Sequence, residues 1–369
     1  MKRALSVTAL FLLIVGSALW AESKSPVILE RARSLRSFDD EGVQRKELEG
    51  DVWITKDSLS VFCQKAIYYP DSGALIFQRE VQFSQPGRTL YADEVIYNEN
   101  TEEVLARGHV RVYQDSLRAS AHRAVYSERF KNGYLYDDVR IVDDNRKITL
   151  TGQTGFFDHD HEFAYVTGSP LLTQRDSSLA LLTQILGDTI KYFGDRKQAH
   201  ALGNVIIERD SLMAYGTLLQ FHQDSSYAEL IGEPRAVQNT DNISGDTLRL
   251  YFKDEQLEHL EVLGNAVATS PADSIHTDLL NRMEGKQMSL WIADNALSRI
   301  QVEGNAIATY YIRDEGKPQG RNTTSGDRLL VFFADSKISQ IEVHGGTRGV
   351  YAPERLVQRE LNEPDQTRQ

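Results

Sequence analysis

The sequence predicts an all-β protein built from repeated antiparallel hairpins. Closely similar stretches, such as ADEVIYNENTEEVLARGHV at 92–110, recur along the 369 residues. Their spacing of about 30 residues is typical of repeat architectures. The runs within each stretch are short, rich in β-branched residues and alternately apolar and polar, which favours strands. Turn-forming clusters such as PDSG, NEN and KDEQ separate the runs, so consecutive strands are expected to pair antiparallel.

The first element, residues 1–21, has the layout of a secretory signal peptide. Positive charge at Lys2 and Arg3 precedes an apolar stretch at 4–20, and the small residue Ala21 ends it. We therefore expect export across the inner membrane and removal of this segment. The alternative is an uncleaved membrane anchor, because about 17 apolar residues is the lower limit for crossing a bilayer. No cysteine directly follows the stretch, so a lipidated N-terminus is not expected.

About ten repeats fill residues 22–352. In most of them a glycine stands two residues before a small or apolar residue, and we expect it to mark a bulge or tight bend in a strand. Arg79 and Asp137 occupy the glycine position in two repeats. The residues that end this motif are Val52, Val81, Val110, Val139, Pro170, Val205, Pro234, Ala266, Ala306 and Thr347.

Four segments need separate interpretation. The stretch 178–193 could pass for a helix, but its second half matches other repeats and predicts a strand. Two insertions, 270–285 and 311–326, lengthen their repeats, and we interpret them as loops between strands. The polar C-terminal tail at 353–369 is expected to be disordered.

Side-chain alternation assigns one face of the strands to the interior. Successive residues of a strand point to opposite faces, and one phase is apolar or aromatic almost throughout, whereas the other includes Lys191, Gln220 and Arg249. The apolar phase therefore faces inward. Its members include Tyr68, Val95, Tyr97, Tyr126, Phe157, Ile190, Tyr192, Leu219, Phe221, Leu250, Leu290 and Val331. Periodicity leaves open whether this interior is filled by its own side chains or is a groove for an apolar ligand.

Composition narrows the function classes. The net charge of -12 argues against nucleic acid and anionic lipid headgroups as partners. The single cysteine, Cys63, gives no internal disulfide and is expected to be a buried apolar residue. The cluster DHDHE at 158–162 is the strongest metal-like pattern, but it falls at a turn and is expected to be solvated. With no phosphate loop or nucleophile elbow in the sequence, we expect no enzyme, metal or cofactor.

Several short motifs carry a resemblance to a known family. They are VILERARSLR at 27–36, ADEVIY at 92–97, GDTIKYF at 187–193, GNV at 203–205, SGDTLRLYF at 244–252, GNA at 264–266 and at 304–306, and SGDRLLVFF at 325–333. With this set in register behind a signal segment, the chain resembles the OstA-like, or LptA, family of periplasmic lipopolysaccharide-transport proteins over about residues 27–350.

The resemblance implies an elongated, V-shaped antiparallel β-jellyroll whose apolar inside is partly open. The twelve inward residues named above would then line a lipid-binding groove. The implied function is that of a periplasmic bridge or chaperone that shields lipopolysaccharide acyl chains during transport to the outer membrane.

The implied partners are other jellyroll-domain transport proteins at the inner and outer membranes. We expect these partners to add strands to the edges near Val27–Ser34 and Ile341–Val350, where head-to-tail self-association is also possible. Two alternatives stay open. One is a structural or adhesive surface repeat protein with a closed core, and the other is an adaptor of the same system anchored in the inner membrane.

Overall fold

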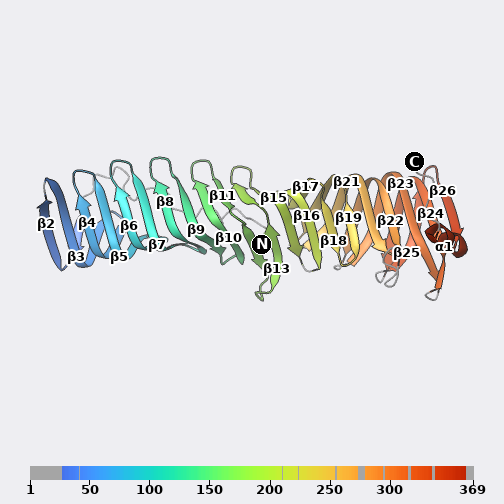
Figure 1. The fold of residues 1–369 in the computed structure, drawn as a ribbon, viewed down its shortest axis with the longest axis horizontal. Helices are drawn as coiled ribbons and strands as arrows, with labels where there is room; N and C mark the ends of the chain where they lie inside the picture. Colours follow the sequence, from blue (N-terminus) through green and yellow to red (C-terminus); the bar gives the residue numbers. More distant parts are fainter. Residues whose placement is uncertain are drawn as a thin grey trace. The chain divides into compact units, whose positions relative to one another are not determined.

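The computed structural model describes residues 27–362, except 41, 210, 223, 254–255, 273–278, 294–295, 315–316 and 335–336. The signal peptide predicted at 1–21 lies outside the described residues. The chain divides into two compact units, one ending at residue 202 and the other beginning at residue 203. Figure 1 shows the strands coloured in chain order.

The unit that ends at residue 202 is formed, over its described residues, by fourteen strands and the beginning of a fifteenth. Their bounds are β1 (Ile28–Arg31), β2 (Ser34–Asp40), β3 (Val43–Lys56), β4 (Leu59–Tyr69), β5 (Ala74–Gln85), β6 (Arg88–Asn98), β7 (Glu103–Gln114), β8 (Leu117–Ser127), β9 (Asn132–Asp143), β10 (Ile148–Asp158), β11 (Phe163–Thr167), β12 (Leu171–Arg175), β13 (Leu181–Leu186), β14 (Thr189–Phe193) and β15 (Gln198–Arg209).

The described part of the unit from residue 203 onward contains the rest of β15, the remaining strands and one helix. Their bounds are β16 (Leu212–His222), β17 (Tyr227–Ile231), β18 (Arg235–Gln238), β19 (Asp241–Ser244), β20 (Thr247–Lys253), β21 (Gln256–Pro271), β22 (Leu280–Ala293), β23 (Ala296–Asp314), β24 (Lys317–Ala334), β25 (Lys337–His344), β26 (Arg348–Pro353) and α1 (Glu354–Asn362).

The strands pair antiparallel with their neighbours along the chain. The long strand β6, for example, pairs with β5 on one side and β7 on the other over nearly its whole length. At some positions along the sheet two short strands take the place of one long strand. Both β11 and β12 pair with β10, one with each half of that strand. The prediction of an all-β antiparallel fold is therefore confirmed.

The long strands fold over near their middle. In β5 the register of the pairing with β6 shifts between Gln78 and Val81. The rings of Phe77 and Phe83, on either side of this shift, have centroids only 5.2 Å apart. In a straight strand residues six positions apart are separated by about 20 Å. The two halves of β5 therefore face each other across a bend, as the jellyroll expectation requires.

We call the two halves arm A and arm B. Arm A is the half of β3, β5, β7, β9, β15, β21 and β23 that precedes the bend, together with the strands or half-strands that pair with it. Arm B is the half that follows the bend, together with its partners.

Buried apolar side chains lie on the inner faces of both arms. In β6 the buried residues are Leu90 and Ala92 on arm B, and Val95 and Tyr97 on arm A. The three-residue step from Ala92 to Val95 restores the inward phase after the bend. The core thus lies between the two arms.

Two expectations about segments are wrong. Instead of forming loops, most of the insertions at 270–285 and 311–326 extend the hairpins β21–β22 and β23–β24 as paired strand. The tail is helical at Glu354–Asn362, because Val357 is an apolar residue that this helix buries. The strand predicted within 178–193 is confirmed by β13 and β14. Nowhere in the described residues is there a helix long and apolar enough to cross a membrane.

Candidate functional site

The interior between the arms is the candidate site, and all twelve predicted lining residues lie on arm A. Three of them, Tyr68, Phe221 and Leu250, are half-buried. The other nine are at most 6% exposed: Val95, Tyr97, Tyr126, Phe157, Ile190, Tyr192, Leu219, Leu290 and Val331. In this structure the interior is therefore packed with the protein's own side chains.

A second wall, on arm B, was missed by the sequence analysis. Its buried residues face arm A and include Ile54, Val61, Phe83, Leu90, Val112 and Ile141. Each strand alternates regularly on arm B, but the bend shifts the alternation by an odd number of residues in strands such as β6. If the apolar–polar alternation is followed along a strand without allowing for this shift, it identifies the inward residues of only one arm. The second wall could have been found by assigning the apolar–polar alternation afresh after each motif glycine, where the strand bends.

Aromatic rings of arm A stack directly across an intervening strand. The rings of Tyr126 on β8 and Phe157 on β10 are nearly parallel, with centroids 5.8 Å apart. Gly133 of β9 pairs with both residues. A Cβ atom at Gly133 would lie 2.7 Å from the Phe157 ring, which is too close. The absence of a side chain on Gly133 thus permits this stack.

Each bend is made by two consecutive residues with positive φ, which we call a bend pair. Few residues other than glycine adopt this left-handed region. Arg79 and Asp137, at the two positions without glycine, adopt it as well, so their repeats bend in the same way. The ten bend pairs are Gly50–Asp51, Arg79–Glu80, Gly108–His109, Asp137–Asp138, Gly168–Ser169, Gly203–Asn204, Gly232–Glu233, Gly264–Asn265, Gly304–Asn305 and Gly345–Gly346.

A second set of glycines lets the arms approach each other beside the bend. Gly285, on arm B of β22, lies under Val302, on arm A of β23, and a Cβ atom there would come within 2.5 Å of the valine. The same relation holds between Gly326 and Val343, at 2.7 Å. Val302 is completely buried. Gly326 belongs to the SGD motif at 325–327, and Gly285 holds the corresponding position in the segment EGK at 284–286. The close approach of a valine explains why a glycine recurs there.

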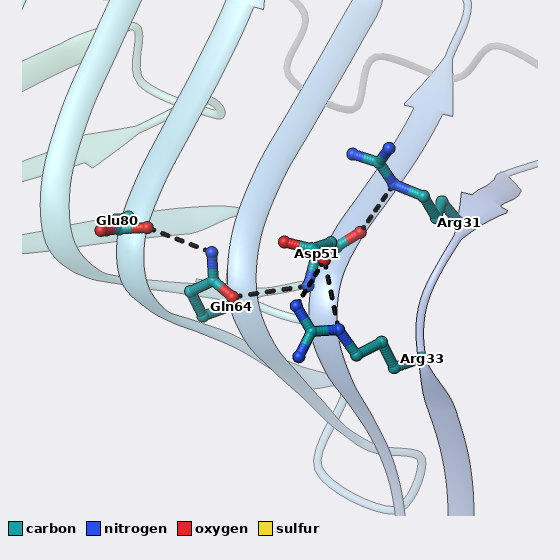
Figure 2. A network of polar contacts seen from close by, with 5 residues as sticks. All are labelled: Arg31, Arg33, Asp51, Gln64 and Glu80. Carbon is teal, nitrogen blue, oxygen red and sulfur yellow. Dashed lines mark hydrogen bonds and ion pairs between the residues drawn. The ribbon is translucent and has the colours of Figure 1, made fainter.

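A polar network ties the first bends together on the outside (Figure 2). Arg33 donates to the Asp51 carboxylate at 2.8 Å. Gln64 accepts from the Asp51 backbone N–H at 3.4 Å and donates to Glu80 at 3.1 Å. The hydrogen bond and charge of Arg33 hold the pKa of Asp51 below its usual value. The network links the connection between β1 and β2 to β3, β4 and β5.

The tyrosines of arm A direct their hydroxyl groups toward a polar rim. Burial, followed by the nearby carboxylates Glu128 and Glu102, raises the pKa of Tyr97 well above its usual value. Arg88, on arm B, interacts electrostatically with Tyr126 of arm A, and burial lowers the pKa of this arginine. The interior is thus apolar between the arms and polar where they end.

The outward face of arm A carries rows of stacked rings that the sequence analysis also missed. In the first unit Phe156 stacks against Tyr134 and Tyr165, with centroid distances of 4.8 and 5.3 Å. In the second unit His259 lies between Tyr251 and Trp291, at 5.2 and 4.8 Å. Such cross-strand pairs stabilise a sheet. Ring stacking accounts for these residues without a ligand.

The remaining candidate groups have structural explanations. In the DHDHE turn, His161 bonds to Asp158 at 2.9 Å, and this bond raises the pKa of the histidine. No group of metal-ligating side chains is found among the described residues. Cys63 is buried, and burial raises the pKa of its thiol to about 11. A thiol with this pKa is almost entirely protonated near neutral pH and is therefore a poor nucleophile.

Comparisons with known proteins find a matching family model and similar solved structures. The sequence model of a family described as OstA-like protein matches residues 24–181. Among solved structures, the chain is similar to LptH from Pseudomonas aeruginosa, described as the LptA homologous periplasmic component of the conserved lipopolysaccharide transport device. The identity is 17%, the match covers 29% of this chain and 76% of that chain, and the TM-score is 0.26. No curated protein matches.

Proposed function

Because the OstA-like family model matches residues 24–181, we propose that the chain is a periplasmic lipid carrier. It shields the acyl chains of lipopolysaccharide, or of a related lipid, between arms A and B during transport to the outer membrane. The protein acts by binding and has no catalytic role.

The observation that carries this proposal is the unbroken inner face of each unit. Most successive strands place an apolar side chain at the same level of arm A, for example Tyr97, Val104 and Tyr126, so that a bound acyl chain would contact protein along its length. Transferring one methylene group from water to an apolar environment is worth about 0.8 kcal/mol. An acyl chain of about twelve carbons would therefore gain on the order of 10 kcal/mol from such cover.

Binding requires the arms to separate, because nine of the twelve lining residues are buried by the protein itself. Within each arm the strands are held by hydrogen bonds, whereas the bend pairs interrupt the pairing register. Small changes in φ and ψ at the bend pairs would open the interior without breaking either arm. The lipid headgroup would then remain at the polar rim.

The terminal strands are the proposed sites for partner proteins. At one end Ile28 of β1 and Leu35 of β2 are exposed, and at the other end Ile338 of β25 and Val350 of β26 are exposed. A terminal strand offers unpaired backbone groups to another sheet. Jellyroll domains of the same transport system, or further copies of this chain, would add their strands there.

A photo-crosslinking experiment tests the proposed function. A photoreactive amino acid replaces Tyr97, Phe157 or Phe221 on the inward face, and matched controls carry it at Ile96, Lys191 or Gln220. The first set is expected to form adducts with lipopolysaccharide in cells, because those side chains face the interior. Adducts from both sets, or from neither set in a folded and exported protein, would contradict the carrier function.

The closed packing of the interior favours a second candidate, a structural or adhesive repeat protein. In that case the arms never separate and no lipid enters, so the same experiment distinguishes the two functions. An adaptor anchored in the inner membrane differs from the carrier only in keeping residues 1–21. Sequencing the mature N-terminus decides that point.

A further inference from the structure

In strands β21 to β24 of the second unit arm B is longer than in the strands before them, and its inner face changes from apolar to polar along its length. In β7 arm B runs from Val110 and ends at Gln114, whereas in β23 it continues from Ala306 to Asp314. The added length comes from the segments 270–285 and 311–326, which the family resemblance does not explain. Where the structure describes them, these segments continue the inner face of arm B beyond its apolar part.

The added part of this inner face is polar. Ala306 and Ala308 of β23 are buried, and the next residue on the same face is Tyr310. Tyr310 pairs with Asn322 of β24, and Asn322 pairs with Tyr351 of β26. Directly opposed residues of antiparallel strands share a face. Tyr310, Asn322 and Tyr351 therefore form a polar row about 7 Å beyond the level of Ala308.

The groups of this polar row are neutral and arranged for hydrogen bonding. The Asn322 side-chain amide donates to the Tyr310 hydroxyl oxygen at 2.6 Å. A hydroxyl that accepts one hydrogen bond still has its own proton to donate. Tyr310 and Asn322 are half-buried and Tyr351 is 55% exposed, so a ligand can approach from solvent.

The wall on arm A remains apolar at the corresponding levels. Leu290 and Val331 are buried, and the next inward residues, Ile292 and Phe333, are half-buried. The second unit thus has an apolar wall on arm A. The facing wall on arm B has small side chains near the bend and polar side chains farther from it. An acyl chain fits the first environment and a hydroxyl-rich group fits the second.

We propose that the polar row binds the saccharide hydroxyl groups of the lipid whose acyl chains lie between the arms. This inference rests on the proposed function and adds a headgroup site within the second unit. Sugar hydroxyls match the row because they both donate and accept hydrogen bonds. The row itself has no cationic side chain for a phosphate.

The test compares two neutral ligands that share an alkyl chain, octyl glucoside and octan-1-ol, below micellar concentrations. Their affinities for the purified protein are measured by displacement of a fluorescent fatty acid. The variants are Tyr310→Phe and the double variant Tyr310→Phe/Asn322→Leu. The matched control is Thr309→Val/Thr323→Val, which removes two hydroxyl groups 3.2 Å apart from the outward face of the same strands.

We expect the double variant to lose octyl glucoside affinity by about 5- to 160-fold, since it removes two neutral hydrogen bonds that are each worth about 0.5–1.5 kcal/mol. Octan-1-ol affinity should stay unchanged, and the outward control should match the wild type. Unchanged octyl glucoside affinity in both variants would overturn the headgroup site while leaving the carrier function intact. If the wild type bound neither ligand, the carrier function itself would fail. Tyr310→Phe alone removes only one oxygen atom, so it still tests the headgroup site if the double variant does not fold.

Discussion

Gly108 shows what a bend pair demands of a single residue. Its φ of 71° lies in the left-handed region, and a Cβ atom would overlap the side chain of Asp93 on the neighbouring strand. Gly87, in the turn between β5 and β6, has a similar φ of 76° but nothing within 4 Å of a Cβ atom. Substitution of Gly87 would therefore introduce backbone strain alone, whereas substitution of Gly108 would introduce backbone strain and steric overlap.

We predict that Gly108→Ala destabilises the protein more than Gly87→Ala. The strain of a left-handed alanine costs about 1–2 kcal/mol at either site, and only Gly108→Ala adds the displacement of Asp93. Urea denaturation of both variants and the wild type measures the difference in the free energy of unfolding. Equal losses would show that Asp93 moves aside freely and that the bend requires glycine for its φ alone.

At the scale of elements, the sequence predicted arm A well and arm B poorly. Val95 and Tyr97 alternate in one phase and lie inward as expected. Ala92, only three residues before Val95, continues the same inner face out of phase because the bend lies between them. Apolar–polar alternation predicts which side chains face inward within one arm, but it does not predict how the strand continues after a bend.

The longer hairpins and the helix escaped prediction for a different reason. The segment 311–326 is polar enough to resemble a loop, yet Tyr310 and Asn322 pair as strand residues because their neighbours supply partners on both sides. Val357 is one of the few apolar residues in a polar tail, and helix α1, which contacts β24 and β26, buries it. Both features depend on tertiary contacts that local composition does not encode.

We predict that the first two strands become more mobile in acid. The pKa of Asp51 is lowered, so the contribution of its pair with Arg33 is complete above the ordinary value of 3.8. It is lost as the pH falls through the lowered pKa of the folded state. The protection of β2 amides against hydrogen exchange, corrected for intrinsic rates, should therefore fall below about pH 4.

Asp51→Asn provides the control for this acid effect. It keeps the shape of the side chain and removes the charge, so β2 protection should be low at neutral pH and nearly independent of pH. If the variant kept the acid transition of the wild type, another carboxyl group would be responsible.

At the scale of the whole molecule, the repeat was the most predictable feature. All ten positions inferred from the recurring motif follow a bend pair, including Val81 and Val139, where the motif glycine is missing. The class of fold followed from this repeat. The closed packing between the arms could not be predicted, because alternation gives the direction of side chains and not the distance between two walls.

The terminal strands give the prediction at this scale. Deletion of residues 27–34 removes β1 and exposes a different edge, so binding to a partner jellyroll domain, or self-association, should fall at that end. Analytical ultracentrifugation measures self-association, and pull-down with the isolated partner domain measures binding. An outward double substitution within β7–β8, away from both edges, is the control. Unchanged association after the deletion would exclude this edge as an interface.

The bend pairs have a consequence for how such a chain can change in length. Each repeat carries its own bend and its own pairing surfaces, so duplication or loss of one complete repeat leaves its neighbours with equivalent partners. Strands lie about 4.8 Å apart, and one two-stranded repeat therefore changes the span of its sheet by about 10 Å. If the proposed carrier function holds, gene duplication would therefore lengthen or shorten the lipid-binding interior in steps of about 10 Å.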